Sequence, residues 1–275
     1  MTGDDLCFTP ATELLALYRR RKVSPFEVTR AVLDRIARVN PPLNAYCTVA
    51  GDQALAAARR ATAASAKRGA RLGPLHGVPV SIKDNASTKG IRMTFGSKIF
   101  ETNVPDFDSL VVERLKAAGA IVLGKTNMPE FGAGACTFND VFGPTRNPWN
   151  PRLTCGGSTG GGAVALAMGL GPLAHGSDLG GSLRIPAAFC GVVGFRTSPG
   201  LVPVYPATLA WDPWSVHGPM SRTVADTALM LSVIAGGDPR APLSYPVDTR
   251  TFLRDRKSTR LNSSHIQKSR MPSSA

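Results

Sequence analysis

Two serines stand on separate glycine-rich segments near the middle of the chain. Ser158 lies within the run C-G-G-S-T-G-G-G at positions 155–162, and Ser182 follows two glycines, 24 residues further on. Because glycine has no Cβ, the backbone N–H groups of such turns can point at a bound ligand. A hydroxyl beside several N–H donors is what acyl transfer requires. These residue types predict serine-dependent cleavage of an amide bond.

The second glycine segment supplies the expected nucleophile and the donors around it. We expect the Ser182 hydroxyl to attack the carbonyl carbon. The N–H groups of Leu179, Gly180, Gly181 and Ser182 would then bind the oxyanion, where a single donor is typically worth about 3–4 kcal/mol of the barrier. An isolated G-G-S sequence is more often a structural turn, so this interpretation depends on the other groups in the chain.

A lysine supplies the expected base. Lys83 follows the alternating apolar residues Val78, Val80 and Ile82, a pattern that predicts the end of a buried strand. A lysine base has to be neutral, and lowering its pKa from ~10.4 to ~7 costs about 4–5 kcal/mol, which burial can provide. The alternative is an exposed lysine paired with Asp84. The spacing alone favours neither.

Ser158 is expected to carry the proton between base and nucleophile. A serine hydroxyl inside so tight a glycine loop favours an unusual backbone, and we consider a cis peptide bond between Gly157 and Ser158. The alternative role is the N-cap of a helix expected at residues 161–169, which serine fills well. The two roles are compatible.

Other chemistries fit the sequence less well. Residues 119–126 match the phosphate-loop pattern GxxxxGK[ST], but residues 120–123 read as an apolar strand instead of a loop around phosphates. No GxSxG motif accompanies His76, His175 or His217, which we interpret as structural or pocket histidines. No cluster of possible ligands has metal-binding spacing, and the five cysteines contain no CxxC pair, so we expect neither metal nor cofactor nor disulfides.

The charge and hydropathy of the chain limit its expected partners. The net charge of +13 comes from scattered basic residues without interleaved aromatic side chains, which favours a solvated surface over a nucleic-acid site. No apolar run reaches membrane-spanning length, and the first residues lack the apolar region after a basic start that is typical of a signal peptide. We therefore expect a cytoplasmic protein without a membrane or nucleic-acid partner, and a homodimer remains open.

Apolar periodicity predicts helices alternating with short buried strands. This alternation indicates an α/β fold, with a mixed and largely buried sheet flanked by helices on both faces. We expect one domain over residues 1–254. Residues 255–275 are rich in serine and lack periodicity, so we expect a disordered and non-native tail. The expected helices cover residues 10–22, 24–39, 52–68, 108–119, 161–169 and 223–235, and the expected strands lie near 78–82 and 120–123, with an exit turn at 124–127.

Several ordered motifs resemble the amidase signature family, and together they cover nearly all of residues 8–245. The resemblance implies a Ser-Ser-Lys triad of Ser182, Ser158 and Lys83, with an oxyanion hole at residues 179–182. It also implies that Asp178 and Arg184 support that loop. Besides the two glycine segments, the motifs are G-P-L-H-G-V-P-V-S-I-K-D-N at 73–85, A-G-A-I-V-L-G-K-T-N-M-P-E-F at 118–131, R-N-P-W-N-P at 146–151, C-G-V-V-G-F-R at 190–196 and G-P-M-S-R-T-V-A-D at 218–226.

The resemblance has departures that bear on the function. Thr159, Ser177 and Arg196 replace residues that are frequent in the family, and family members generally extend far beyond residue 254. We expect hydrolysis of a small-molecule carboxylic amide to an acid and ammonia or an amine. The alternatives are the glutaminase subunit of a tRNA-dependent amidotransferase, which passes ammonia to a partner, and an inactive fragment of an amidase. Residues 183–186 and 200–203 favour a stand-alone amidase.

Overall fold

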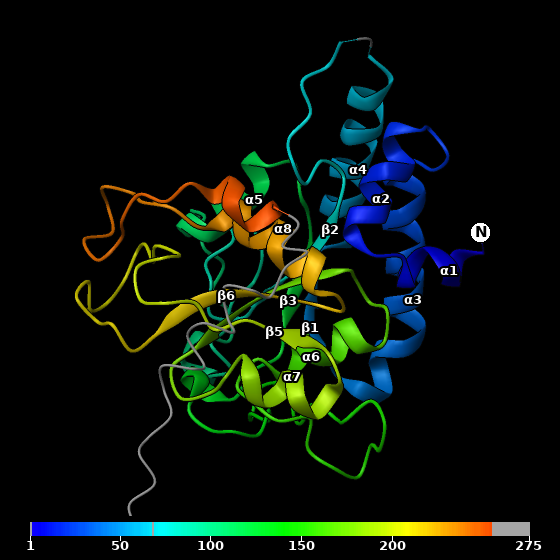
Figure 1. Ribbon diagram of the computed structural model, residues 1–275. Helices are drawn as coiled ribbons and strands as arrows, with labels where there is room; N and C mark the ends of the chain where they lie inside the picture. The colour runs from blue at the N-terminus through cyan, green and yellow to red at the C-terminus, as the bar shows by residue number, and fades with distance from the viewer. Residues whose placement is uncertain (1, 68, 255–275) are drawn as a thin grey trace, which may run out of the picture.

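The computed structural model describes residues 2–67 and 69–254, and its centre is one six-stranded mixed sheet (Figure 1). The expected tail at 255–275 lies outside the described residues. Across the sheet the strands run in the order β1-β3-β2-β4-β6-β5. Their bounds are β1 Tyr46–Val49, β2 Pro79–Lys83, β3 Ile121–Thr126, β4 Leu173–Asp178, β5 Val193–Gly194 and β6 Val216–Ser221.

Helices cover both faces of this sheet, which confirms the predicted fold class. In Figure 1, α6 and α7 lie on one side of the sheet and α5 and α8 on the other, while α1 to α4 gather beside the β1 edge. The helices are α1 Gly3–Phe8, α2 Ala11–Arg19, α3 Pro25–Leu43, α4 Gly51–Ala66, α5 Leu110–Ala117, α6 Gly160–Ala167, α7 Arg184–Cys190 and α8 Val224–Ile234. Short 3-10 helices occupy Lys98–Phe100, Glu130–Gly132 and Thr249–Leu253.

The six predicted helices are present, and α3 shows why its start was readable and its end was not. Ser24 and Glu27 form the expected capping box, in which each side chain accepts from the other's N–H. The predicted end at residue 39 is wrong, because the helix continues through two prolines to Leu43. Proline's fixed φ suits a helix, and Asn44 ends this one in the left-handed conformation.

Strand β3 extends further than predicted. The expected exit turn at 124–127 is wrong, because the buried strand runs through Thr126. Lys125 can occupy a buried strand position because its ammonium group donates to the carbonyl of Ala86 and to the hydroxyl of Thr88. Since residues 121–123 lie inside the strand, the rejection of a phosphate loop is confirmed.

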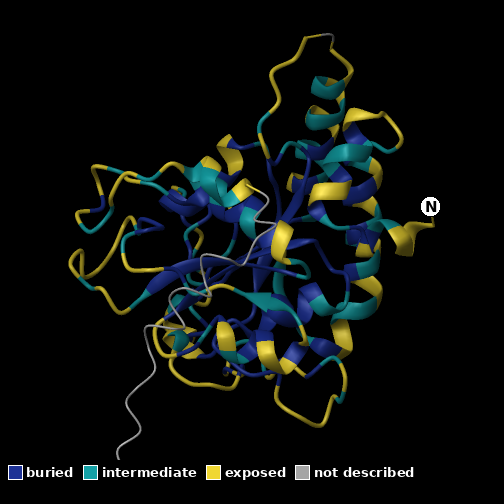
Figure 2. Ribbon diagram, in the orientation of Figure 1, coloured by how far each residue is buried: buried dark blue, intermediate teal, exposed yellow. Residues whose placement is uncertain are grey.

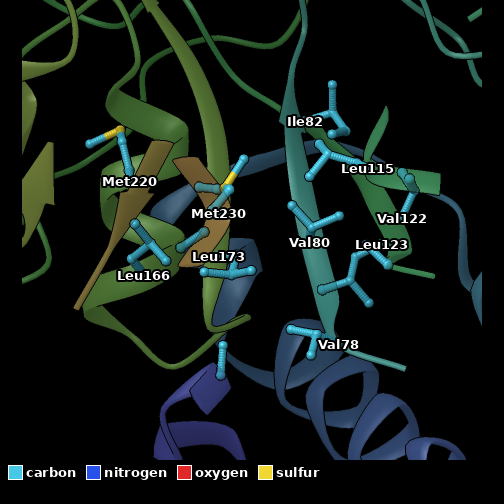
Figure 3. Close-up of a cluster of buried hydrophobic side chains, with 14 of the residues drawn as sticks. Val78, Val80, Ile82, Leu115, Val122, Leu123, Leu166, Leu173, Met220 and Met230 are labelled. Carbon is cyan, nitrogen blue, oxygen red and sulfur yellow. The ribbon is translucent and has the colours of Figure 1, made fainter. Parts of the chain in front are cut away.

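The core lies between the sheet and the helices on its two faces. Figure 3 shows part of this core as a cluster of buried side chains, each at most 1% exposed, with members Val80 of β2, Leu123 of β3, Leu173 of β4, Leu166 of α6 and Met230 of α8. Burying one such side chain stabilises the fold by about 1.5–3 kcal/mol. Figure 2 shows that the strands are buried along most of their length, as expected for the central parallel part of a sheet.

The parallel strands place the site at one edge of the sheet. Because β2 runs parallel to both β3 and β4, the carboxyl ends of these three strands meet at the same edge. Lys83 ends β2 and Asp178 ends β4. The carboxyl edge of parallel strands is where open α/β sheets usually bind ligands.

Helix α6 approaches this edge closely enough to require glycine. A Cβ added to Gly161 would lie 2.5 Å from the carbonyl oxygen of Ala45 and closer still to the backbone nitrogen of Asn127. We expect Gly161→Ala to lower the free energy of unfolding by at least about 1–3 kcal/mol, because backbone atoms cannot move aside easily. Urea denaturation measures this change.

Gly51, at the start of α4, provides the matched control. No heavy atom lies within 4 Å of its added Cβ. Gly51→Ala should leave stability unchanged or raise it by up to about 1 kcal/mol, because alanine is the better helix former. Equal effects of the two substitutions would contradict close packing at Gly161.

Candidate active site

Lys83 is wholly buried and touches two serines. Its Nζ lies 2.7 Å from Oγ of Ser158 and 2.9 Å from Oγ of Ser177. The exposed pairing with Asp84 is absent, since that carboxylate instead accepts from the backbone N–H and the hydroxyl of Thr94. The sequence left open whether Lys83 is buried or is exposed and paired with Asp84, and in the structure it is buried.

The surroundings of Lys83 favour a neutral amine. Burial lowers the pKa of Lys83 to about 7, although the negative charge of Asp178 opposes this shift. A neutral amine has a lone pair that can accept a proton, and a pKa near neutrality suits a base that works at ordinary pH. The Lys83 amine can therefore both bind and release a proton near neutral pH.

Ser158 lies at the turn that leads into α6. The Gly157–Ser158 peptide bond is cis, the geometry considered from the sequence, and Ser158 is 2% exposed. The N-cap alternative is wrong, because Thr159 occupies the N-cap position of α6. The N–H of Thr159 donates to the carbonyl of Ser182 over 3.1 Å, which joins the two glycine-rich segments.

Ser158 and Ser182 line the same cavity. It has a volume of about 500 Å³, and its wall also includes Asn85 and Ser177. Ser182 is partly exposed, and its hydroxyl has no hydrogen-bond partner among the described residues. Since Lys83 contacts Ser158 from within the core, the structure brings the three predicted residues to one place.

The turn before Ser182 is organised around the carboxylate of Asp178. This carboxylate accepts from the N–H groups of Gly181 and Leu183 and from the guanidinium groups of Arg184 and Arg196. Burial alone would raise the pKa of Asp178, but these hydrogen bonds outweigh it and hold the pKa well below its usual range. Asp178 is therefore ionised and fixes the shape of the turn.

The expected oxyanion donors differ from one another in their contacts. The N–H of Gly181 donates to Oδ1 of Asp178 over 2.8 Å. Those of Leu179, Gly180 and Ser182 have no partner among the described residues. An ideal Cβ on Gly180 would meet nothing within 4 Å, so a ligand can approach the backbone there.

We expect Asp178→Asn to destabilise the protein by about 3 kcal/mol, because an amide NH₂ group would face the donors that the buried carboxylate now satisfies. The fall in melting temperature near pH 7 measures this loss. Asp248→Asn is the matched control, since Asp248 pairs with Arg250 at the surface. Surface pairs contribute about 0–1 kcal/mol, so similar losses for both variants would contradict the assigned role.

Sequence reasoning missed two contacts of this site. Ser177 accepts hydrogen bonds from Lys83 and from Asn85, the latter over 3.0 Å, and thereby holds the lysine from a second side. Arg196 contacts Asp178, although it comes from a segment 18 residues further along the chain. The sequence marked Ser177 and Arg196 only as replacements of residues that are frequent at these positions in the family.

Two other kinds of site are absent from the described part of the chain. Within residues 2–67 and 69–254, no three His, Cys, Asp or Glu side chains cluster as metal ligands would. None of the helices there combines the length and the apolar character needed to cross a membrane.

The model of the family described as Amidase matches residues 27–266, and the chain belongs to this amidase signature family. The chain is 46% identical over 253 residues to a glutamyl-tRNA(Gln) amidotransferase subunit from Carboxydothermus hydrogenoformans, covering 90% of this chain and 52% of that protein. It is 44% identical over 244 residues to an acylamidase from Rhodococcus erythropolis, covering 89% of this chain and 51% of that protein.

Solved structures give the same picture. A bacterial aryl acylamidase of the amidase signature family superposes with a TM-score of 0.83 and 36% identity, over 87% of this chain and 50% of that one. A peptide amidase from Stenotrophomonas maltophilia superposes with a TM-score of 0.78 and 35% identity, over 91% and 51%. The chain therefore spans about half the length of the relatives it matches.

Proposed function

We propose that this chain carries the catalytic centre of an amidase, which hydrolyses a carboxylic amide to an acid and ammonia or an amine. The observation that carries the proposal is the buried Lys83, whose Nζ lies 2.7 Å from Ser158 at the wall of the cavity that Ser182 also lines. Three such groups can generate a serine nucleophile without histidine.

The first half of the reaction forms an acyl-enzyme. Ser182 Oγ attacks the amide carbon while its proton passes to Ser158, whose own proton passes to the neutral Lys83. The N–H groups of Leu179, Gly180 and Ser182 stabilise the negative oxygen. If the N–H of Gly181 also binds the oxyanion, it first has to give up its hydrogen bond to Asp178. Collapse of the intermediate breaks the C–N bond, and the proton returns from Lys83 through Ser158 to the leaving nitrogen.

The second half repeats the same proton transfers with water. Water attacks the acyl carbon while Ser158 and Lys83 take up its proton, and the proton then returns to Ser182 as the acid leaves. Ser177 supports both halves, because its oxygen accepts from Lys83 and fixes the direction of the amine. Asn85 fixes Ser177 in turn.

The glutaminase alternative has its own support. Several relatives of high identity are named as subunits of glutamyl-tRNA(Gln) amidotransferases, including those from Acidothermus cellulolyticus and Moorella thermoacetica. Such a role would require delivery of ammonia to a partner. We favour the stand-alone amidase over this alternative. We further propose that residues 1–254 act as one domain. We also propose that the protein works in the cytoplasm.

A screen of primary, aryl and peptide amides together with glutamine tests this proposal. We expect the full chain to release ammonia or amine, and peptide mapping after rapid acid quench to find the acyl group on Ser182. Release from glutamine alone would favour the glutaminase. An acyl group on another residue would contradict the assigned nucleophile. Absence of release from the entire panel would support the inactive fragment.

A further inference from the structure

A second and larger cavity adjoins the catalytic one. It has a volume of about 1010 Å³ and shares Asn85 and Ser215 with the smaller cavity. Much of its wall is apolar, including an edge-to-face pair of Phe95 and Phe100 with ring centroids 5.4 Å apart. An apolar group attached to the reacting amide could therefore extend from one cavity into the other.

Two histidines that the proposed mechanism does not use lie beside this cavity. His217 of β6 belongs to its wall, and its Nδ1 lies 3.0 Å from Nε2 of His175, which is fully buried on β4. Nδ1 of His175 is buried without a partner among the described residues. Nε2 of His217 has no partner there either, but it is not sealed from solvent.

These contacts assign the positions of the ring protons. A neutral His175 carries one proton, and Nδ1 stays without a partner among the described residues in either tautomer; an unpaired buried N–H donor is rarer in proteins than an unpaired acceptor, which disfavours a proton on Nδ1. The proton therefore belongs on Nε2, from which it is donated to Nδ1 of His217. His217 then accepts at Nδ1 and carries its own proton on Nε2, the nitrogen that solvent can reach.

The pair is uncharged at neutral pH. Burial lowers the pKa of His217 to about 4, with the positive charge of Lys83 acting in the same direction. The pKa of His175 also lies well below its ordinary value, chiefly because of burial and then because of His217. A neutral donor suits a wall that is apolar over much of its area, because no buried charge on the histidines has to be compensated.

We infer that the larger cavity binds an apolar, aromatic substituent of the amide substrate, and that Nε2–H of His217 donates a hydrogen bond to an acceptor atom on that substituent. The inference rests on the proposed function for the position of the reacting amide. It makes His217 a specificity-determining residue and the His175 ring the group that fixes its tautomer.

Calorimetric binding to a Ser182→Ala protein tests the inference without turnover. The probes are two matched pairs: para-acetylbenzamide with para-isopropylbenzamide, and para-acetylacetanilide with para-isopropylacetanilide. Within each pair an acceptor carbonyl replaces an apolar group of similar shape. The pairs place the ring on the acyl side or on the amine side of the amide, so the responding pair also identifies that side.

We expect His217→Phe to weaken the acetyl compound relative to its isopropyl partner by about threefold to tenfold in at least one pair, the value of one neutral hydrogen bond. Unchanged ratios in both pairs would overturn the role of His217. This readout does not depend on hydrolysis. If the ratio of acetyl to isopropyl affinities changes but the unmodified protein cleaves no amide, the binding pocket would be supported and the proposed function rejected.

A second variant keeps the test decisive if His217→Phe does not fold. Val204 lines the larger cavity, so Val204→Trp should weaken every bound probe at least about tenfold by placing an indole ring inside it. Val224→Trp is the control, because that valine is 71% exposed and lies outside the cavity wall. Equal probe affinities for the two tryptophan variants would overturn the cavity as the binding site.

Discussion

Ser182→Ala should lower kcat by a factor of about 10³–10⁶ and leave the fold intact. The factor is large because the substitution removes the atom that bonds to the acyl group, and the residual rate comes only from binding and oxyanion stabilisation. Stability should change by less than about 0.5 kcal/mol, since Ser182 is partly exposed and its hydroxyl has no hydrogen-bond partner among the described residues. Steady-state hydrolysis and a thermal melt measure the two quantities.

Ser198→Ala is the matched control for this substitution. Ser198 is exposed and lies outside both cavities, so its loss should leave kcat within about twofold of the unmodified protein. A Ser182→Ala protein that keeps more than about a tenth of the original kcat would remove Ser182 from the role of nucleophile. A comparable loss in Ser198→Ala would point to a general effect of substitution.

The parts of this site that the sequence predicts are those with local signals. Glycine runs mark the turns that hold Ser158 and Ser182, because backbone that approaches a ligand closely excludes side chains. Apolar alternation before Lys83 marks the buried strand that carries it. Local capping residues likewise give the start of α3. In each case, neighbours within a few residues decide the structure.

The missed strands show the limit of such signals. β4 contains Ala174, Gly176 and Asp178, and β6 contains a glycine and a proline, all of them residue types that are depleted in strands. They are strands because they pair with each other and because β4 also pairs with β2. Contacts such as Lys83 with Ser177 follow from that pairing, and the separation of 94 residues conceals them in the sequence.

Burial of Lys83 connects the fold to the proposed chemistry. An exposed lysine would be protonated at neutral pH and could not accept a proton from Ser158. The central position of β2 in the sheet removes water from the amine, and the two serine hydroxyls replace only part of the lost hydration. The burial that lowers the pKa of Lys83 should therefore also lower the free energy of unfolding.

Lys83→Met should abolish detectable hydrolysis, because no other group contacts Ser158 as a base among the described residues. In the unmodified protein, kcat/KM should rise about tenfold per pH unit below pH 7 and level off above it, as the amine loses its proton. A rate independent of pH from 5 to about 9 would contradict Lys83 as the base. Lys89→Met, at an exposed lysine, should leave the profile unchanged.

The same substitution should change how stability depends on pH. Between pH 7 and about 10.4, the unfolded chain holds a proton on residue 83 that the folded protein has lost. The free energy of unfolding of the unmodified protein should therefore rise relative to Lys83→Met by up to about 1.4 kcal/mol per pH unit in this window. Below pH 7 both the folded and the unfolded chain bind the proton. The free energy of unfolding of the unmodified protein relative to Lys83→Met is then constant and at its lowest. Urea denaturation of both proteins from pH 6 to about 10 measures this slope, and parallel stability curves would show that Lys83 titrates normally.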